Sequence, residues 1–409
     1  MSSPTPRKTL AKGLVFVGAA TVVGSGAAFL LSMVAARVLT PDEFGALGAL
    51  LGMLVIISTI SIATQAVVAR RVAVSSGQER ASVEGEAVRL SILVGIVIVL
   101  AGVLLAWPLG TAFAIPTAAV ATGIASLGFV VVGSAAMGIA QGREEHVRLS
   151  WAFLANQLGR AIGGIVGVLV LQSVLGVGVG VLIGCAIGAA IAYRIACPGV
   201  WGSSLSRGVT TEFLHVVHAL AVLFTLTNVD VLLARLFLDG AASGEYSVGV
   251  QLAKIAFFLP NAIVIVLFPK MTSGDNRRAV YIATGLTALV GVFITAFSFV
   301  FGDLVARILG GAQYTELGSE IWLFALEGSA FALVQVLLYA RLATQDRKAV
   351  IAVWAALIVQ VGVIVLWRHD SLVEIVTTVV AVSLVLTVAG LFMDRRQVPQ
   401  VAIPMEVAE

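Results

Sequence analysis

Residues 13–38 read GLVFVGAATVVGSGAAFLLSMVAARV, an apolar run with no charged residue before Arg37. A transmembrane α-helix needs about 20 consecutive, mainly apolar residues, so this run can cross a bilayer. Three basic residues precede it, as they do in a secretory signal peptide. The run is longer than the apolar core of such a signal, and no cleavage site of small residues follows it. We therefore expect a retained first membrane span.

The composition extends this interpretation to the whole chain. Of the 409 residues, 59% are hydrophobic and 11% are charged, and the mean hydropathy is +1.06. A water-soluble chain of this length carries more polar residues, so we predict an all-α integral membrane protein. About twelve transmembrane helices are expected, at residues 13–38, 46–69, 89–110, 114–140, 148–172, 174–193, 212–238, 245–268, 279–301, 317–340, 349–367 and 372–392.

The lysine and arginine residues predict the orientation of these spans, because basic residues accumulate in cytoplasmic segments. With the N-terminus inside, 19 of the 25 basic residues fall in cytoplasmic segments and two inside spans. The other four are external: Arg37, Arg235, Arg307 and Arg368. A span added or removed would disrupt this alternation. We therefore expect a multi-pass protein of the cell (plasma) membrane with both termini in the cytoplasm.

A short pattern occurs twice and predicts an internal repeat. Residues 36–39 (ARVL), followed by 45–47 (GAL), correspond to residues 234–237 (ARLF), followed by 244–246 (GEY). Six spans separate the two copies, so both have the same orientation in the membrane. Parallel repeats of this kind are typical of transporters, whose substrate site lies between the repeats.

The repeat divides the chain into two six-helix lobes, 1–205 and 206–409. Charged residues inside the second lobe distinguish it from the first. An ionised residue at the centre of a bilayer costs roughly 2.5–3.5 kcal/mol on insertion scales, so it needs a partner or a hydrated cavity. Asp230 and Lys254 fall at similar depths in neighbouring spans, where they would form a structural ion pair or line a cavity. Asn228 lies two positions before Asp230 and is a further cavity candidate.

Polar residues in other spans add candidates. Asn156, Gln157 and Arg160 form a polar face in the fifth span, and a guanidinium there would bind phosphate oxygens. Glu327 in the tenth span is either a site for a coupling proton or cation, or the partner of Arg160. Pro260 interrupts the eighth span and is a hinge candidate.

Other residues point to packing rather than chemistry. Cys185 and Cys197 lack metal-ligand spacing, and no basic stripe suggests nucleic-acid binding. We expect no metal, no cofactor and no enzyme activity, because no nucleophile–base pair is visible and the external loops are too short for a glycosyltransferase or polymerase. Glycines recur at four-residue spacing, which predicts close helix packing: Gly163 and Gly167, and Gly180, Gly184 and Gly188.

Three stretches carry a family resemblance. Residues 36–45 (ARVLTPDEFG), 228–233 (NVDVLL) and 267–270 (LFPK) resemble the polysaccharide-transporter family of lipid-linked oligosaccharide and O-antigen flippases. This family belongs to the multidrug/oligosaccharidyl-lipid/polysaccharide exporter superfamily. The motifs are short, but the resemblance in span count and repeat covers most of the chain.

The resemblance implies a flippase that moves a lipid-linked oligosaccharide or polysaccharide precursor from the cytoplasmic to the outer leaflet by alternating access. It implies a cavity in which Arg160 and Lys254 contact the headgroup, Asp230 occupies a typical family position, and Arg37 belongs to the first motif. The expected partners are the lipid-linked sugar and membrane lipids, with H+ or Na+ as candidate coupling ions and a glycan polymerase or ligase as candidate protein partner. Few basic residues line this cavity, so a teichoic-acid precursor fits equally well.

Competing functions remain open. Residues 70–77 (RRVAVSSG) do not match the turn that major-facilitator transporters carry between their second and third spans. A drug/cation antiporter of the sister branch stays an alternative, and a membrane glycosyltransferase, a polymerase or a non-transporting scaffold is less well supported. Drug-stimulated ion flux without glycolipid movement would indicate the antiporter.

Overall fold

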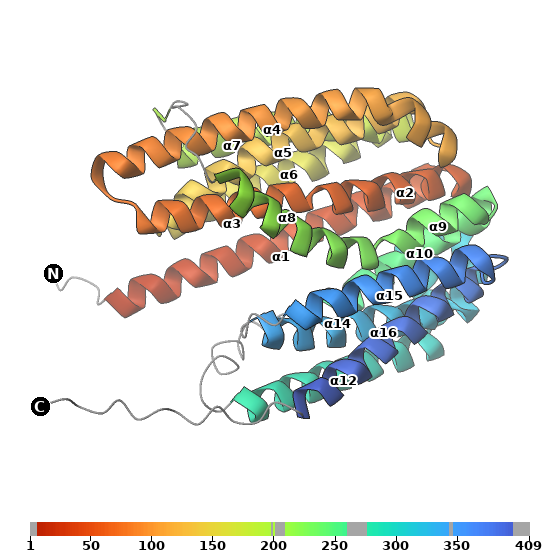
Figure 1. Cartoon of the computed structure of the whole chain (residues 1–409). Helices are drawn as coiled ribbons and strands as arrows, with labels where there is room; N and C mark the ends of the chain where they lie inside the picture. The colour runs from red at the N-terminus through yellow and green to blue at the C-terminus, as the bar shows by residue number, and fades with distance from the viewer. Residues whose placement is uncertain (1–5, 198, 201–208, 260–275, 343–346, 396–409) are drawn as a thin grey trace, which may run out of the picture.

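The structure, a computed structural model, describes residues 6–197, 199–200, 209–259, 276–342 and 347–395 (Figure 1). These residues form helices joined by short turns, with no β-strand among them. The predicted all-α membrane class is confirmed: long apolar helices run side by side along one direction (Figure 1).

The first seven helices pack together as an N-terminal bundle. They are α1 (Pro6–Val38), α2 (Pro41–Ile57), α3 (Thr59–Val74), α4 (Gly77–Ala112), α5 (Thr117–Gly142), α6 (His146–Leu171) and α7 (Val174–Ala196). The predicted glycine packing joins α6 to α7. A Cβ atom on Gly163 would collide with the backbone carbonyl of Gly180, and one on Gly180 with that of Gly163. Only glycine therefore permits this backbone separation.

The remaining helices form a C-terminal bundle. They are α8 (Val209–Leu226), α9 (Val229–Phe237), α10 (Gly240–Phe258), α12 (Asn276–Val300), α13 (Gly302–Leu309), the 3-10 helix η1 (Ala312–Ser319), α14 (Ile321–Leu342), α15 (Arg347–Leu366) and α16 (Leu372–Arg395). Helix α14 packs against α10, α12 and α16. The predicted lobe boundary at residues 205 and 206 lies outside the described residues and stays a prediction.

The structure resolves the spans only in part. Among the described residues, eight helices are long and apolar enough to cross a membrane, or ten if each of two bent pairs is one span. The bent pairs are α8 with α9, at 47°, and η1 with α14, at 72°. Helix α15 is a shorter apolar helix, and α10 is described only to Phe258. The predicted count of twelve and the repeat stay predictions.

One predicted continuous span is broken by side chains that bond the backbone. In the span predicted at 212–238, the Thr227 hydroxyl donates to the Leu223 carbonyl, and the Asn228 amide donates to the Phe224 carbonyl at 3.0 Å. Such side chains compete with the helical backbone and favour a helix end. In the span predicted at 46–69, α2 and α3 meet at Ser58, whose hydroxyl bonds the carbonyl of Val55, and the two helices together form one candidate span, Pro41–Val74.

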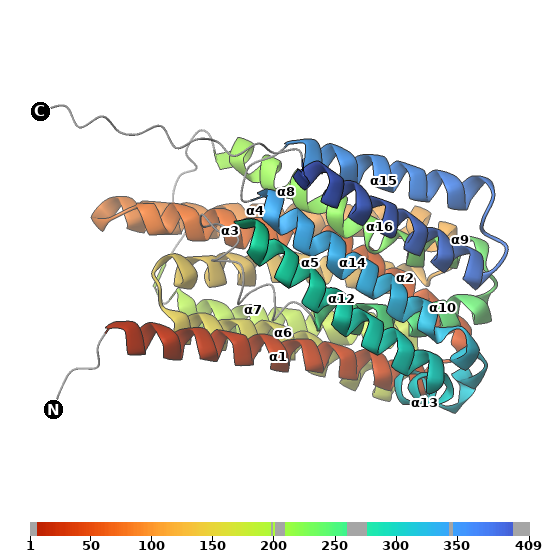
Figure 2. The same ribbon diagram turned by 90° about the horizontal axis from the view of Figure 1, so that it is seen from below.

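The two bundles meet most closely where α2 and α10 begin, which we call the closed end (Figure 2). A Cβ atom on Gly48 would collide with Ser247, and one on Gly244 with the carbonyl of Pro41. The capping box of Thr40 and Glu43 starts α2 at this point. Away from the closed end, the bundles diverge toward the end from which α1 starts, which we call the open end (Figure 1).

Candidate functional site

A cavity of about 760 Å³ lies between the two bundles. Helices α1, α2 and α6 line one side, and α8, α10, α14 and α15 line the other. Most of its wall is apolar, and six phenylalanines contribute: Phe29, Phe44, Phe224, Phe257, Phe258 and Phe331. Binding sites for small ligands have volumes of about 300–1,000 Å³ and a similar pattern of apolar walls with few polar groups.

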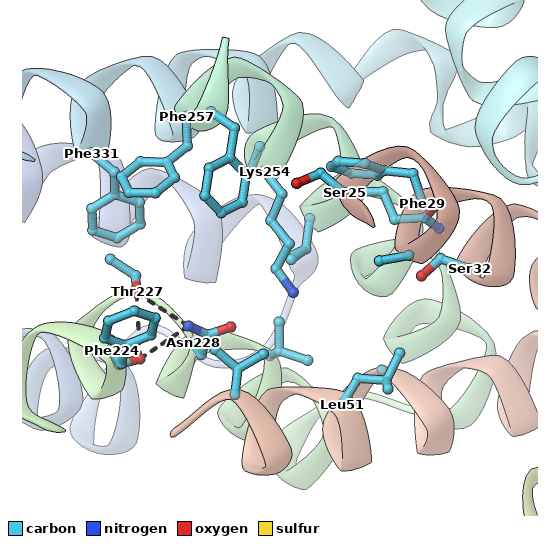
Figure 3. Close-up of a pocket in the computed structure, with 18 of the residues that line it drawn as sticks. Ser25, Phe29, Ser32, Leu51, Phe224, Thr227, Asn228, Lys254, Phe257 and Phe331 are labelled. Atoms are coloured by element: carbon cyan, nitrogen blue, oxygen red, sulfur yellow. Dashed lines mark hydrogen bonds between the residues drawn. The ribbon is translucent and has the colours of Figure 1, made fainter. Parts of the chain in front are cut away.

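Five residues predicted from the sequence come together in this cavity. They are Gln157 and Arg160 from α6, Asn228 from the break before α9, Lys254 from α10 and Glu327 from α14. Figure 3 shows the Lys254 amine extending into the space above Asn228. The five side chains come from both bundles, so a ligand here would contact both at once.

Two cations face the same apolar space. Arg160 and Lys254 line the cavity from opposite bundles, close enough to interact electrostatically. Like charges repel strongly where water is scarce, because the effective dielectric constant is low. An anionic group between the two side chains would remove this repulsion and bond both. The arrangement is therefore suited to a phosphate or carboxylate group.

A pair of buried carboxyl groups lies next to Lys254. Asp230 is 1% exposed and Glu327 is 2% exposed, and the two lie within hydrogen-bonding reach of each other. The Tyr246 hydroxyl donates to one oxygen of Asp230 at 2.9 Å. The other oxygen of Asp230 and one oxygen of Glu327 have no partner in the described part of the chain. Two carboxyl groups this close favour the binding of a proton or a cation between them.

The predicted ion pair between Asp230 and Lys254 is not formed as a direct contact. Over the ranges that the structure describes, no atom pair within 4.0 Å links their charged groups, although the two charges interact at longer range. Asp230 instead accepts a hydrogen bond from Tyr246, and it lies in the first turn of α9, directly after the break at Asn228.

Three predicted site residues lie elsewhere. Asn156 is buried in the N-terminal bundle against Gly133 and is not part of the cavity wall. Arg37 lies at the closed end, where it bonds the carbonyl of Ile308. Pro260 falls outside the described residues, so its role as a hinge stays a prediction.

Gln251 lines the cavity one turn before Lys254 on α10 and was not among the residues predicted from the sequence. Its spacing of three residues from Lys254 was the available signal.

Two arginines join the bundles at the closed end. Arg235 from α9 donates to the carbonyls of Phe113 and Ala114, at 3.0 and 2.9 Å, and pairs with Asp42 at 2.6 Å. Arg37 from α1 reaches the opposite way and donates to the carbonyl of Ile308 at 2.6 Å. These are the two arginines of the predicted repeat, and the arginine of each bundle bonds the backbone of the other bundle. We call this set the arginine clasp.

The fold is that of known transporters. The lipid II flippase MurJ in an inward closed conformation matches with a TM-score of 0.79 and 11% identity, over 93% of this chain and 87% of that one. A multidrug resistance MATE family transporter of the MOP superfamily matches in its inward-facing conformation with a TM-score of 0.75 and 13% identity, over 90% and 93%. An outward-facing structure of such a transporter matches with a TM-score of 0.70 and 15% identity, over 96% of this chain and 98% of that one.

A search of curated proteins finds no match. A family model does match, over residues 10–275, which is more than half of the chain and includes α1 to α10. Its description is polysaccharide biosynthesis protein. The chain belongs to this family of polysaccharide biosynthesis proteins.

Proposed function

We propose that this multi-pass membrane protein is a flippase, which moves a lipid-linked oligosaccharide or polysaccharide precursor from the cytoplasmic to the outer leaflet. The observation that carries the proposal is the pair of cations, Arg160 and Lys254, which line an apolar cavity from two different bundles. The family supports a role in polysaccharide synthesis, and one structure with the same fold is a lipid II flippase.

The distribution of lysine and arginine supports an orientation with both termini in the cytoplasm. In that orientation the closed end faces outward and the open end faces the cytoplasm, as an inward-facing state requires. The headgroup would enter between the bundles and bind Arg160 and Lys254. Alternating access would then separate α2 from α10 at the closed end and bring the bundles together at the open end.

The carboxyl pair is our proposed coupling site. A proton or a Na+ ion bound between Asp230 and Glu327 would neutralise one negative charge beside Lys254. Lys254 would then be free to bond an anionic headgroup. Binding of the ion and of the headgroup would in this way favour each other, as linkage between two sites requires.

The test is headgroup movement by the purified protein. Proteoliposomes would contain fluorescent undecaprenyl-pyrophosphoryl-N-acetylglucosamine, and dithionite would quench only the lipid exposed in the outer leaflet. Arg160→Ala and Lys254→Ala should each slow the movement at least tenfold, since each removes a charge-assisted contact of about 1.5–3 kcal/mol. Arg368→Ala is the matched control, because Arg368 contacts Thr377 far from the cavity. Wild-type rates in both cavity variants would refute the assignment.

A drug/cation antiporter is the second candidate. The MATE transporters share the fold, and six phenylalanines with two buried carboxyl groups would suit an organic cation. The two cations of the cavity argue against it, because they would repel such a substrate. Ion flux stimulated by ethidium, together with no lipid movement, would favour the antiporter over the flippase.

A further inference from the structure

We propose that Gln251 and Asn228 form a subsite that binds the first sugar ring next to the phosphate group of the substrate. This inference rests on the proposed flippase function and deepens it, because it assigns a role in specificity to two neutral side chains. Gln251 did not figure among the residues predicted from the sequence.

The first observation is unused hydrogen-bonding capacity. Gln251 is 6% exposed and Asn228 is 4% exposed, and both line the cavity. Neither the oxygen nor the nitrogen of the Gln251 amide has a partner in the described part of the chain, and the Asn228 oxygen also lacks one. A buried polar group without a partner costs about 1–3 kcal/mol. The three atoms are buried in residues that line one cavity, so a ligand that reaches them would supply their partners.

The second observation fixes the direction of the Asn228 amide. Its nitrogen donates to the carbonyl of Phe224 at 3.0 Å and to the Thr227 hydroxyl at 3.1 Å. The carbonyl oxygen is therefore held toward the cavity, and Figure 3 shows it pointing to the Lys254 side of the space. An acceptor held in this way needs a donor from the ligand.

The third observation separates a sugar from other ligands. A phosphate offers mainly acceptor oxygens, so it suits Lys254 and Arg160 but not the oxygens of Asn228 and Gln251. The charged nitrogen of an organic cation has no lone pair, so it offers no acceptor for the Gln251 nitrogen. A sugar hydroxyl both donates and accepts, so two or more hydroxyls of one sugar ring satisfy all three atoms.

The spacing on α10 joins the two parts of the headgroup. Gln251 and Lys254 are three positions apart and share one face of α10. A phosphate on Lys254 therefore holds the attached sugar ring within reach of Gln251, which lies one turn nearer the start of α10. Cations bind the phosphate, and amides recognise the sugar.

The test compares two lipids that differ only in the sugar. Purified full-length protein in nanodiscs would bind undecaprenyl pyrophosphate and undecaprenyl-pyrophosphoryl-N-acetylglucosamine, with Kd measured by native mass spectrometry. Gln251→Met keeps the length of the side chain and removes the amide. It should weaken binding of the sugar-bearing lipid about tenfold, equivalent to one or two lost hydrogen bonds, and change binding of the sugar-free lipid less than twofold. Lys254→Ala should weaken both.

Asn156→Leu is the matched control, because it removes a buried amide outside the cavity wall. It should leave the ratio of the two affinities unchanged. Gln251→Leu repeats the test with a branched side chain in case one variant folds poorly. An unchanged ratio in both Gln251 variants, with the Lys254 effect retained, would overturn the subsite and leave the flippase proposal standing. If the wild-type protein bound neither lipid, the flippase proposal would fail and the subsite with it.

Discussion

Replacing Arg235 should open the closed end of the protein. The Arg235 side chain is 6% exposed and bonds two backbone carbonyls of the N-terminal bundle, while its partner Asp42 is 65% exposed. Hydrogen bonds to a charged group contribute about 1.5–3 kcal/mol each, and an exposed ion pair contributes about 0–1 kcal/mol. In the open state, water would form hydrogen bonds with the same groups and replace part of this stabilisation of the closed state. The remainder, about 3 kcal/mol, corresponds to roughly a 100-fold change in the open fraction.

The assay is labelling of a single cysteine inside the cavity. Leu51 lines the cavity on α2, so Leu51→Cys would report access, in a background where the buried Cys185 and Cys197 are replaced by alanine. A membrane-impermeant maleimide added to intact cells should react about 100-fold faster after Arg235→Ala. Arg235→Lys should show an intermediate rate, because lysine keeps the charge but loses the planar fork of donors.

Arg368→Ala is the control, since Arg368 does not join the bundles. A rate within twofold of wild type for Arg235→Ala would refute the role of the arginine clasp. Faster labelling in inverted vesicles, but not in intact cells, would instead refute the proposed orientation and leave the clasp intact.

Three further predictions concern stability and the buried charges. Gly163→Ala should lower the free energy of unfolding in detergent by about 1–3 kcal/mol, since the added methyl group collides with the Gly180 carbonyl. Gly26→Ala is the control, because its methyl group meets no atom within 4 Å and should have little effect. Glu84→Gln should lower the free energy of unfolding by about 2 kcal/mol, because Glu84 accepts two hydrogen bonds from Arg143, at 2.7 and 2.6 Å. The same hydrogen bonds raise the pKa of Arg143. The control is Glu145→Gln, which should change the unfolding temperature little because Glu145 pairs with Arg148 on the surface. Exchanging Asp230 and Lys254 should not restore surface-glycan export, because a lysine at position 230 loses the bond from Tyr246. Export above that of either single variant would contradict this reading.

The sequence predicted the helices well because each apolar run must satisfy its own backbone hydrogen bonds in the bilayer. The break at Asn228 was missed for the opposite reason. There, Thr227 and Asn228 bond backbone carbonyls, and nothing in the apolar pattern reveals this competition. Asp230 lies directly after that break, so its partner could not be predicted.

The charged residues of the site were predictable, because placing a charge inside a membrane span costs free energy. Arg160, Lys254 and Glu327 stand out in the sequence because a charge in a span needs a partner or a hydrated cavity, and all three line the cavity. Gln251 and the phenylalanines do not stand out, because similar residues occur throughout membrane helices. Which of them face the cavity is decided by the packing of α10 against α14 and α2, which is tertiary information.

The four charges around the cavity have a consequence for the energetics of transport. Arg160 and Lys254 balance Asp230 and Glu327 when both carboxyl groups are ionised. An unloaded carrier of this kind returns through the membrane field without moving net charge in this region. The loaded carrier moves the charge of its cargo together with that of the coupling ion, and each net negative charge driven outward gains about 2.3 kcal/mol per 100 mV of inside-negative potential. The resting voltage of the cell would then drive export directly.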